Sequence, residues 1–353
     1  MFLSCNCFYT KRKIQKEIYM ATKKVRLFTH DDLDGVGCGI LGKSAYGDNI
    51  DVVYCTNSDV NSKINNFILS GAYKNYDRVY ITDISVDAEN AQLIDEFLAD
   101  KTVLLDHHPT AMHLNDYRWA FVDTVYPGET IKTSGTELFY RHLNSMNALD
   151  WRLPYDKFAE VVRDYDTWRW ASQGETGQPS KDFNDLLYLY GREDFEQMMV
   201  DRLKAGQFPE LTPTDQLILG IERRKIDEYC KEKLGTLKTA NAYGHVCGVV
   251  FADQYINDLS HYIMDRNPQL DFVAIINPDG RVSLRTDRED LDLGKEIAGP
   301  LGGGGHPKAA GFAFDSDKTL ELVKDIFTRE DKTQEITHVD ADQSDAISPG
   351  NLD

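Results

Sequence analysis

Between residues 25 and 106, short apolar runs alternate with segments in which apolar residues recur every three or four positions. The runs are rich in Val, Ile, Leu and aromatic residues and predict strands at 25–29, 51–56, 78–85 and 102–106. The segments between them predict helices at 35–46, 60–69 and 88–98. Strands that alternate with helices of about ten residues indicate βαβ units, so we expect a parallel sheet.

The middle of the chain is mainly helical by the same criterion. Helical spacing predicts helices at 134–143 and 155–162, and a segment rich in Gly, Ser and Pro predicts an exposed loop at 173–181. Residues 183–234 are strongly charged, with apolar positions three and four apart. This pattern is typical of an amphipathic helical connector with a solvated charged face.

A second alternation of strands and helices begins near residue 244. It predicts strands at 245–253, 271–277 and 281–287, and helices at 258–266 and 292–298. We therefore expect an α/β fold in which a parallel-sheet domain (21–180) is joined by a helical connector (181–235) to a smaller α/β domain (236–328). Residues 1–20 are a dissimilar extension to which we assign no function, since Met20 is a plausible natural start, and residues 329–353 form an acidic tail that we expect to be frayed.

Composition narrows the classes of function. The net charge of −19 argues against a protein that coats long nucleic acid, but it allows a small anionic substrate held by a few basic groups and metal ions. The six cysteines are scattered without a C-x-x-C pair, which argues against a disulfide framework or a thiolate zinc site and favours a reducing compartment, the cytoplasm. No apolar run approaches the roughly 20 residues of a membrane span, so we expect no membrane association.

Acidic residues and histidines follow three of the first four predicted strands. Because the carboxyl ends of parallel strands meet at one edge of a sheet, we expect these groups to lie together: His30, Asp31, Asp32, Asp34, Asp83, Asp106, His107 and His108. Clustered carboxylates repel one another, and two divalent cations about 3.5–4 Å apart would offset that repulsion and provide a phosphoryl-transfer centre. The alternative is that the aspartates cap three successive helices and that the Asp-His-His tripeptide is a polar turn.

Two further stretches carry candidate chemistry. One of Asp164 and Asp166 could complete a metal cluster, the other being a cap or a salt-bridge partner. Four consecutive glycines, 302–305, precede His306; such a run can present backbone N–H groups to an anion, although flexible loops also contain glycine runs. The presence of Arg285 upstream supports the interpretation of this glycine loop as an anion-binding site.

The THDDLDG, ITD, LLDHH and RDYDTW stretches, together with GGGGHPKAAGF, resemble the motifs of the DHH–DHHA1 phosphoesterases in the same order. The likeness covers residues 24–328 and is strongest to the B-type branch of nanoRNases, or oligoribonucleases. It implies two Mn²⁺ ions (Mg²⁺ being possible) that activate water for attack on phosphorus, and a second domain that grips the substrate.

The resemblance also implies a role for each matching residue. Asp83 would bridge the metals, and the other metal ligands would be His30, Asp32, Asp34, His107 and Asp164, with Asp166 as substitute. Asp83 and Asp106 would form the catalytic set with His108, which would approach the scissile phosphate. Arg285 and the loop from Gly302 to His306, with Gly303, Gly304 and Gly305 between them, would hold substrate phosphates. His30 lies two residues before Asp32 where many relatives have four, so either His30 or Asp31 could supply that ligand.

The favoured function is hydrolysis of short oligoribonucleotides to nucleoside 5′-monophosphates. A phosphodiesterase or phosphatase for a signalling nucleotide, such as a cyclic or linear dinucleotide or 3′-phosphoadenosine 5′-phosphate, is the second possibility, and a nucleotide sensor with a silent site is the third. Inorganic pyrophosphatase is disfavoured by the glycine-rich loop, and a long-strand DNA exonuclease by the acidic charge. Oligomeric state, including a homodimer, is left open.

Overall fold

The computed structural model describes residues 23–314, 318, 320, 321 and 324. The predicted extension at 1–20 and the predicted tail at 329–353 lie outside these residues. The chain divides into two compact units, Met1–Ile221 and Glu222–Asp353. The division falls within helix α10 (Pro213–Leu234), and each unit is described by itself. The division into a first domain (21–180), a connector (181–235) and a second domain (236–328) remains a prediction.

The first unit is built on a five-stranded sheet with the order β2-β1-β3-β4-β5, in which every pairing is parallel. Its strands are β1 (Val25–His30), β2 (Ile50–Cys55), β3 (Arg78–Thr82), β4 (Thr102–Asp106) and β5 (Ala120–Val122). The predicted parallel sheet is therefore confirmed. β5 was not predicted, because three residues are too few to show a period.

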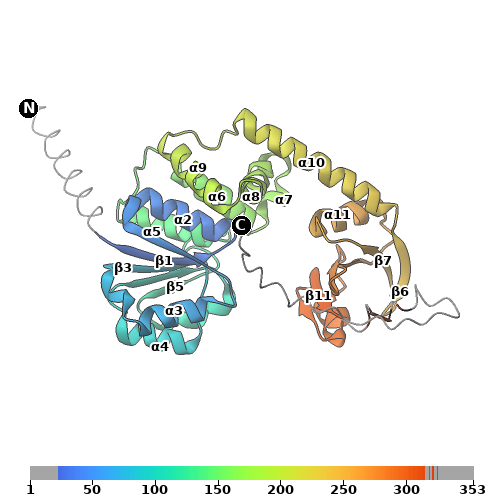
Figure 1. Ribbon diagram of the computed structural model, residues 1–353, viewed down its shortest axis with the longest axis horizontal. Helices are drawn as coiled ribbons and strands as arrows, with labels where there is room; N and C mark the ends of the chain where they lie inside the picture. Colours follow the sequence, from blue (N-terminus) through green and yellow to red (C-terminus); the bar gives the residue numbers. More distant parts are fainter. Residues whose placement is uncertain (1–22, 315–317, 319, 322–323, 325–353) are drawn as a thin grey trace, which may run out of the picture. The chain divides into compact units, whose positions relative to one another are not determined.

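Helices cover both faces of this sheet (Figure 1). α2 (Leu33–Tyr46) and α5 (Gly135–Ser145) pack on one face, and α3 (Val60–Leu69) and α4 (Ala88–Phe97) pack on the other. Each face forms its own apolar core, which explains why the strands are continuous apolar runs and not alternating ones. Short 3₁₀ segments lie between these elements, at Gly47–Asn49, Ala72–Asn75 and Pro109–Asp116.

The rest of the first unit is helical: α6 (Tyr155–Asp166), α7 (Arg169–Ser172), a 3₁₀ turn (Gly174–Gly177), α8 (Gln178–Tyr190) and α9 (Arg192–Lys204). The loop predicted at 173–181 is wrong from Gln178 onward, because a proline at the first turn of a helix costs no hydrogen bond and α8 begins there. Apolar residues of α8 and α9, such as Phe183 and Phe195, belong to the same core as α2 and α5. Two of the three helices in the predicted connector thus pack within the first unit.

The second unit contains a six-stranded sheet with the order β10-β11-β9-β8-β7-β6. Only the β7–β8 pairing is parallel. The strands are β6 (Lys238–Ala242), β7 (His245–Phe251), β8 (Phe272–Ile276), β9 (Arg281–Arg285), β10 (Gly304–Gly305) and β11 (Ala309–Ala313). Its helical elements are α11 (Ile256–Arg266), a π-helical turn (Leu293–Ala298) and a 3₁₀ turn (Gly299–Leu301). Both units are α/β, as expected.

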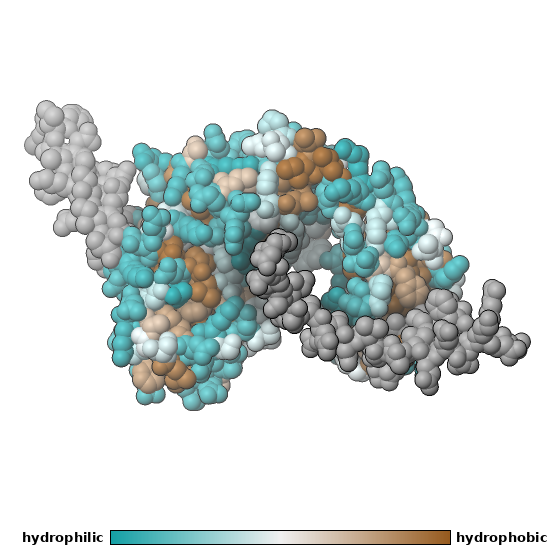
Figure 2. Space-filling view, in the orientation of Figure 1, coloured by the Kyte–Doolittle hydropathy of each residue, from teal (hydrophilic) through white to brown (hydrophobic). Residues whose placement is uncertain are grey.

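The surface in Figure 2 is mainly hydrophilic, with an apolar patch over α10, where Leu217 and Ile221 are exposed one helical turn apart. Among the residues that the structure describes, none of the helices has the length and apolarity that a bilayer crossing needs.

Candidate metal centre

The carboxyl ends of three neighbouring strands position the site. β1 ends at His30, β4 ends at Asp106, and Asp83 directly follows β3. Because β1, β3 and β4 are adjacent and parallel, these residues meet at one edge of the sheet. Asp32 is the N-cap of α2, where its Oδ1 accepts a hydrogen bond from the Gly35 N–H at 3.1 Å. The expected capping role of this aspartate is therefore real, and it leaves Oδ2 for other partners.

Asp34 is buried in the first turn of α2 and is held by the first turn of α5. Its two carboxylate oxygens accept hydrogen bonds from the backbone N–H groups of Gly135 and Thr136, at 2.6 and 2.8 Å. A Cβ atom at Gly135 would lie 2.4 Å from the Asp83 Cβ, so only glycine lets α5 approach this closely. The two backbone N–H donors at the N-terminus of α5 thus fix both oxygens of the Asp34 carboxyl group.

Asp83 lies at the middle of the cluster. Its backbone φ is +57°, a left-handed conformation that Asp tolerates better than most residues and that occurs often at functional sites. Its Oδ1 lies 3.2 Å from His107 Nε2, and its buried Oδ2 has no hydrogen-bond partner. Burial, followed by repulsion from Asp34 and Asp32, raises the pKa of Asp83 well above its usual value. A positive charge in this place would relieve both effects.

Asp106 orients the two histidines that follow it. Its Oδ1 accepts a hydrogen bond from the His107 backbone N–H at 2.8 Å and lies 2.7 Å from His108 Nδ1. The hydrogen bond to Asp106 raises the pKa of His108, whose side chain is half exposed. The ring of His108 therefore favours the cationic form, and its other nitrogen, Nε2, is left for a further partner. Asp106 itself is fully buried.

Three groups of side chains have ligand atoms within 4.8 Å of one another: His30, Asp32 and Asp83; Asp34, His107 and Asp166; and Asp83, Asp106, His107 and His108. Asp83 and His107 each belong to two groups. His30 Nδ1 lies 2.8 Å from Asp32 Oδ2, whereas Asp31 belongs to none of the groups. The structure thus brings together five predicted ligands: His30, Asp32, Asp34, Asp83 and His107.

Asp164 does not join these groups. Arg163 and Arg169 donate hydrogen bonds to its carboxylate at 2.9–3.2 Å, and Gln173 does so at 3.0 Å. Asp166, two residues later on α6, points to the cluster instead, with its Oδ2 3.5 Å from His107 Nε2. Residues two apart lie on different faces of a helix, so only one of the pair can face the site. Asp166, which the sequence analysis gave as the substitute, therefore lies in the acidic cluster, and Asp164 does not.

Aromatic residues beside Asp166 were missed by the sequence analysis. Tyr165, Trp170 and Trp168 form a ladder of stacked rings with centroids 6.0 Å apart at each step, and Trp168 at its end is 60% exposed. Trp168 has a φ of +60°, an unusual conformation for a bulky residue. Tyr188 on α8, also exposed, lies close enough to Asp32 and Asp31 for their charges to raise its pKa after the larger effect of burial. The density of aromatic residues in 163–170 was the available signal.

In the second unit, Arg285 ends β9 and pairs with Ala309, three residues after His306. Its guanidinium donates to Asn257 Oδ1 at 2.8 Å and to the Leu284 carbonyl at 2.8 Å. Burial lowers its pKa from the usual high value. Arg285 thus ends β9, and His306 lies in the connection between β10 and β11 of the same sheet.

The glycine loop differs from the anion nest that the sequence suggested. The backbone N–H groups of Gly302, Gly303 and His306 donate to carbonyls of the chain, and Gly304 and Gly305 pair with β11. Glycine is needed for close packing, since a Cβ at Gly303 would lie 2.1 Å from the Gly311 carbonyl oxygen, and Gly305 has a φ of +139°. All five loop residues remain exposed.

The residues of the first unit fit divalent metal ions. The buried Oδ2 atoms of both Asp83 and Asp106 have no hydrogen-bond partner, and the cluster offers carboxylate and imidazole donors without thiolates. Carboxylate ligands suit Mg²⁺ and Mn²⁺, and imidazole is compatible with the transition metals. The described residues therefore contain an acidic cluster able to bind such metals.

Comparison with known proteins agrees with this geometry. The crystal structure of the exonuclease RecJ bound to manganese has a similar fold, with a TM-score of 0.51 and 15% sequence identity, covering 88% of this chain and 91% of that one. No protein-family model matches the chain. The fold of this chain is therefore that of DHH-domain proteins, and its acidic cluster lies at the carboxyl edge of the parallel sheet.

Two relatives make the assignment more specific. Oligoribonuclease NrnB of Bacillus subtilis is 35% identical over 300 residues, which are 84% of this chain and 74% of the relative. The chain therefore belongs to the DHH–DHHA1 family of phosphoesterases, hydrolases of phosphoester bonds. A 3′,5′-cyclic-nucleotide phosphodiesterase of Helicobacter pylori is 21% identical over 345 residues, covering 84% of this chain and 95% of that protein.

Proposed function

We propose that the protein is a metal-dependent exoribonuclease that hydrolyses oligoribonucleotides of a few residues to nucleoside 5′-monophosphates. The observation that carries this proposal is the membership of Asp83 in two ligand groups, which suits one carboxylate shared by two metal ions. The 35% identity to an oligoribonuclease supports the substrate class. A cytoplasmic location is part of the proposal and rests on the scattered cysteines, of which the four described are free thiols.

The ligand set that we propose for two Mn²⁺ ions, or for Mg²⁺, is His30, Asp32, Asp34, Asp83, His107 and Asp166. When bound, the two ions would neutralise the carboxylates and supply an activated water and Lewis-acid stabilisation of the phosphoryl group. The protein's own contribution is preorganisation. The α5 backbone fixes Asp34, and Asp106 fixes the ring of His108.

His108 is proposed to contact the scissile phosphate. Asp106 accepts the Nδ1–H hydrogen bond and holds the imidazolium, so that Nε2–H can donate to a non-bridging oxygen as negative charge develops there. Asp106 acts through His108 and is a positioning residue. The phosphates of the substrate are proposed to be held by Arg285, His306 and the glycine loop of residues 302–305. In this proposal residues 21–180 form the catalytic domain, residues 181–235 the connector and residues 236–328 the substrate-binding domain.

The exposed end of the aromatic ladder is proposed to stack on a base of the substrate. Every base has an aromatic face, so stacking on Trp168 would bind short RNA without strong sequence preference. A few phosphate contacts and one such surface suit a short substrate. The net charge of −19 would disfavour long RNA at low salt.

The second candidate is a phosphodiesterase for a signalling nucleotide, and the likeness to a cyclic-nucleotide phosphodiesterase at 21% identity is the observation that favours it. A silent sensor would be natural if ligands were missing, but the whole proposed set is present. The test uses chelated protein with and without restored Mn²⁺, on labelled RNA dinucleotide, cyclic dinucleotides and 3′-phosphoadenosine 5′-phosphate. We expect metal-dependent cleavage of the RNA dinucleotide at the highest rate; preference for either of the other substrates would select the second candidate.

A further inference from the structure

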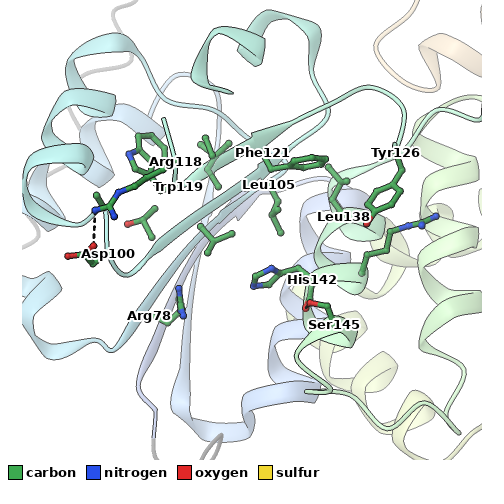
Figure 3. A pocket seen from close by; sticks show the side chains of 16 residues that line it. Arg78, Asp100, Leu105, Arg118, Trp119, Phe121, Tyr126, Leu138, His142 and Ser145 are labelled. Carbon is green, nitrogen blue, oxygen red and sulfur yellow. Dashed lines mark hydrogen bonds and ion pairs between the residues drawn. The ribbon is translucent and has the colours of Figure 1, made fainter. Parts of the chain in front are cut away.

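A cavity of about 520 Å³ lies in the first unit, away from the metal centre. It is lined by β4, β5 and the later turns of α5 (Figure 3). None of the proposed metal ligands lines it. Thr102 begins β4 and Asp106 ends it at the metal centre, so these two residues lie about 13 Å apart along the strand. The residues between them, up to Leu105, line the cavity. The volume is within the range of small-molecule sites.

Apolar and aromatic side chains cover much of the cavity wall. Val103 and Leu105 on β4, Phe121 on β5 and Leu138 on α5 provide this surface. Tyr126 adds an aromatic ring at one side, under the guanidinium of Arg141, which lies 4.1 Å from the ring centroid. A flat aromatic group is the kind of ligand part that such a wall accommodates.

One buried polar atom in this wall, Nε2 of His142 on α5, lacks a hydrogen-bond partner. Burial, with a smaller effect of Arg78, lowers the pKa of His142 to about 4, so the ring is neutral near pH 7. A neutral imidazole can donate or accept a hydrogen bond, and buried polar groups are rarely left without a partner.

The cavity also contains three arginines. Arg118 pairs with Asp100, and Arg141 pairs with Glu129 and Glu137. Arg78 at the start of β3 has no hydrogen bond or ion pair from its guanidinium to any residue that the structure describes. The positive charge of Arg78 is therefore available to form an ion pair with an anionic ligand.

We propose that this cavity is a second binding site, separate from the metal centre, for a small aromatic anion of the nucleoside monophosphate class. The ring system lies against the wall formed by Phe121 and Leu138. One of its heteroatoms bonds His142, and its phosphate meets Arg78. The inference uses only the chemistry of the cavity and does not depend on the proposed activity.

The experiment is a calorimetric titration of metal-free protein with AMP, and with inorganic phosphate and adenosine separately. It is performed in an Arg285→Ala background, so that the second unit contributes no phosphate binding. We expect one AMP per chain, and at least about tenfold weaker binding of phosphate or adenosine alone. His142→Phe, which keeps a ring and removes the polar atom, and Arg78→Gln should each weaken AMP binding about tenfold or more.

The matched controls are Arg152→Gln, an exposed arginine outside the cavity, and Asp83→Asn at the metal centre; neither should change AMP affinity. Circular dichroism checks that each variant folds, and His142→Gln replaces any cavity variant that does not. The proposal is overturned if AMP fails to bind at about 10 mM. It is equally overturned if the cavity variants bind as well as the parent, or if Asp83→Asn abolishes binding.

Discussion

Asp164 and Asp166 lie two residues apart at the end of α6, and the same substitution should affect them in opposite ways. Asp164 is buried among Arg163, Arg169 and Gln173, which satisfy its carboxylate. Asp166 faces Asp34 and Asp32, and burial together with those charges raises its pKa from 3.8 to about 8. We expect Asp166→Asn to stabilise the metal-free protein and Asp164→Asn to destabilise it.

The magnitude for Asp166 follows from proton linkage. Below pH 3.8 the carboxyl is protonated in both the folded and unfolded states, so it carries no penalty. Between about pH 4 and pH 8 the unfolded state releases this proton and the folded state retains it, so stability is lost as the pH rises through that window. Over the roughly three pH units up to pH 7 the loss reaches at most about 4 kcal/mol. Asp166→Asn removes this loss and should raise the melting temperature by roughly 5–10 °C.

For Asp164, the substitution leaves the buried Arg163 and its neighbour Arg169 short of counter-charge, which costs about 3 kcal/mol. The assay is thermal unfolding in EDTA at pH 5 and pH 7.5, with bound manganese measured after reconstitution. The gain from Asp166→Asn should be larger at pH 7.5 than at pH 5, and that variant should lose manganese while Asp164→Asn retains it. Destabilisation by Asp166→Asn, or loss of manganese from Asp164→Asn with normal binding in Asp166→Asn, would refute the assignment.

Three further sets of substitutions test separate parts of the site. Asp83→Ala should abolish turnover and lower bound manganese, since it serves two ligand groups; normal metal content would argue against sharing. Arg285→Ala and His306→Ala should raise KM by roughly tenfold with metal content intact, and loss of metal from either would contradict the separate roles. Trp168→Ala should raise KM for RNA dinucleotides about tenfold while Trp168→Phe recovers part of the loss, and hydrolysis of bis(p-nitrophenyl) phosphate, which lacks a base, should be unchanged; equal effects on both substrates would exclude stacking.

The strand and helix order could be predicted because the first sheet is buried on both faces, so its strands are continuous apolar runs with polar residues at their ends. The same reasoning placed His30, Asp32, Asp83 and His107 at one edge. β6 could not be found this way, since its five residues are mostly exposed and show no apolar period. The choice between Asp164 and Asp166 depends on the rotation of α6, which tertiary packing determines.

Two features needed the folded chain. The aromatic ladder is formed by residues from α6, α7 and the left-handed turn at Trp168, a backbone conformation that composition does not indicate. The glycine loop had the right residues for an anion nest, but most of its N–H groups are donated to the chain's own carbonyls. The residue types of this loop predicted free N–H groups, and the hydrogen bonds of the folded loop show that most of them already have partners.

The central claim is metal-dependent hydrolysis of short RNA, and the most direct test is kcat/KM against RNA length. Manganese-reconstituted protein is assayed on 5′-phosphorylated RNA of two to about twenty-four nucleotides at low and high ionic strength. The account predicts the greatest activity per end at two to about five nucleotides, with a decline at greater lengths that is steeper at low salt, because the charge of −19 repels a long polyanion. A flat or rising profile, or no cleavage of dinucleotides, would contradict it.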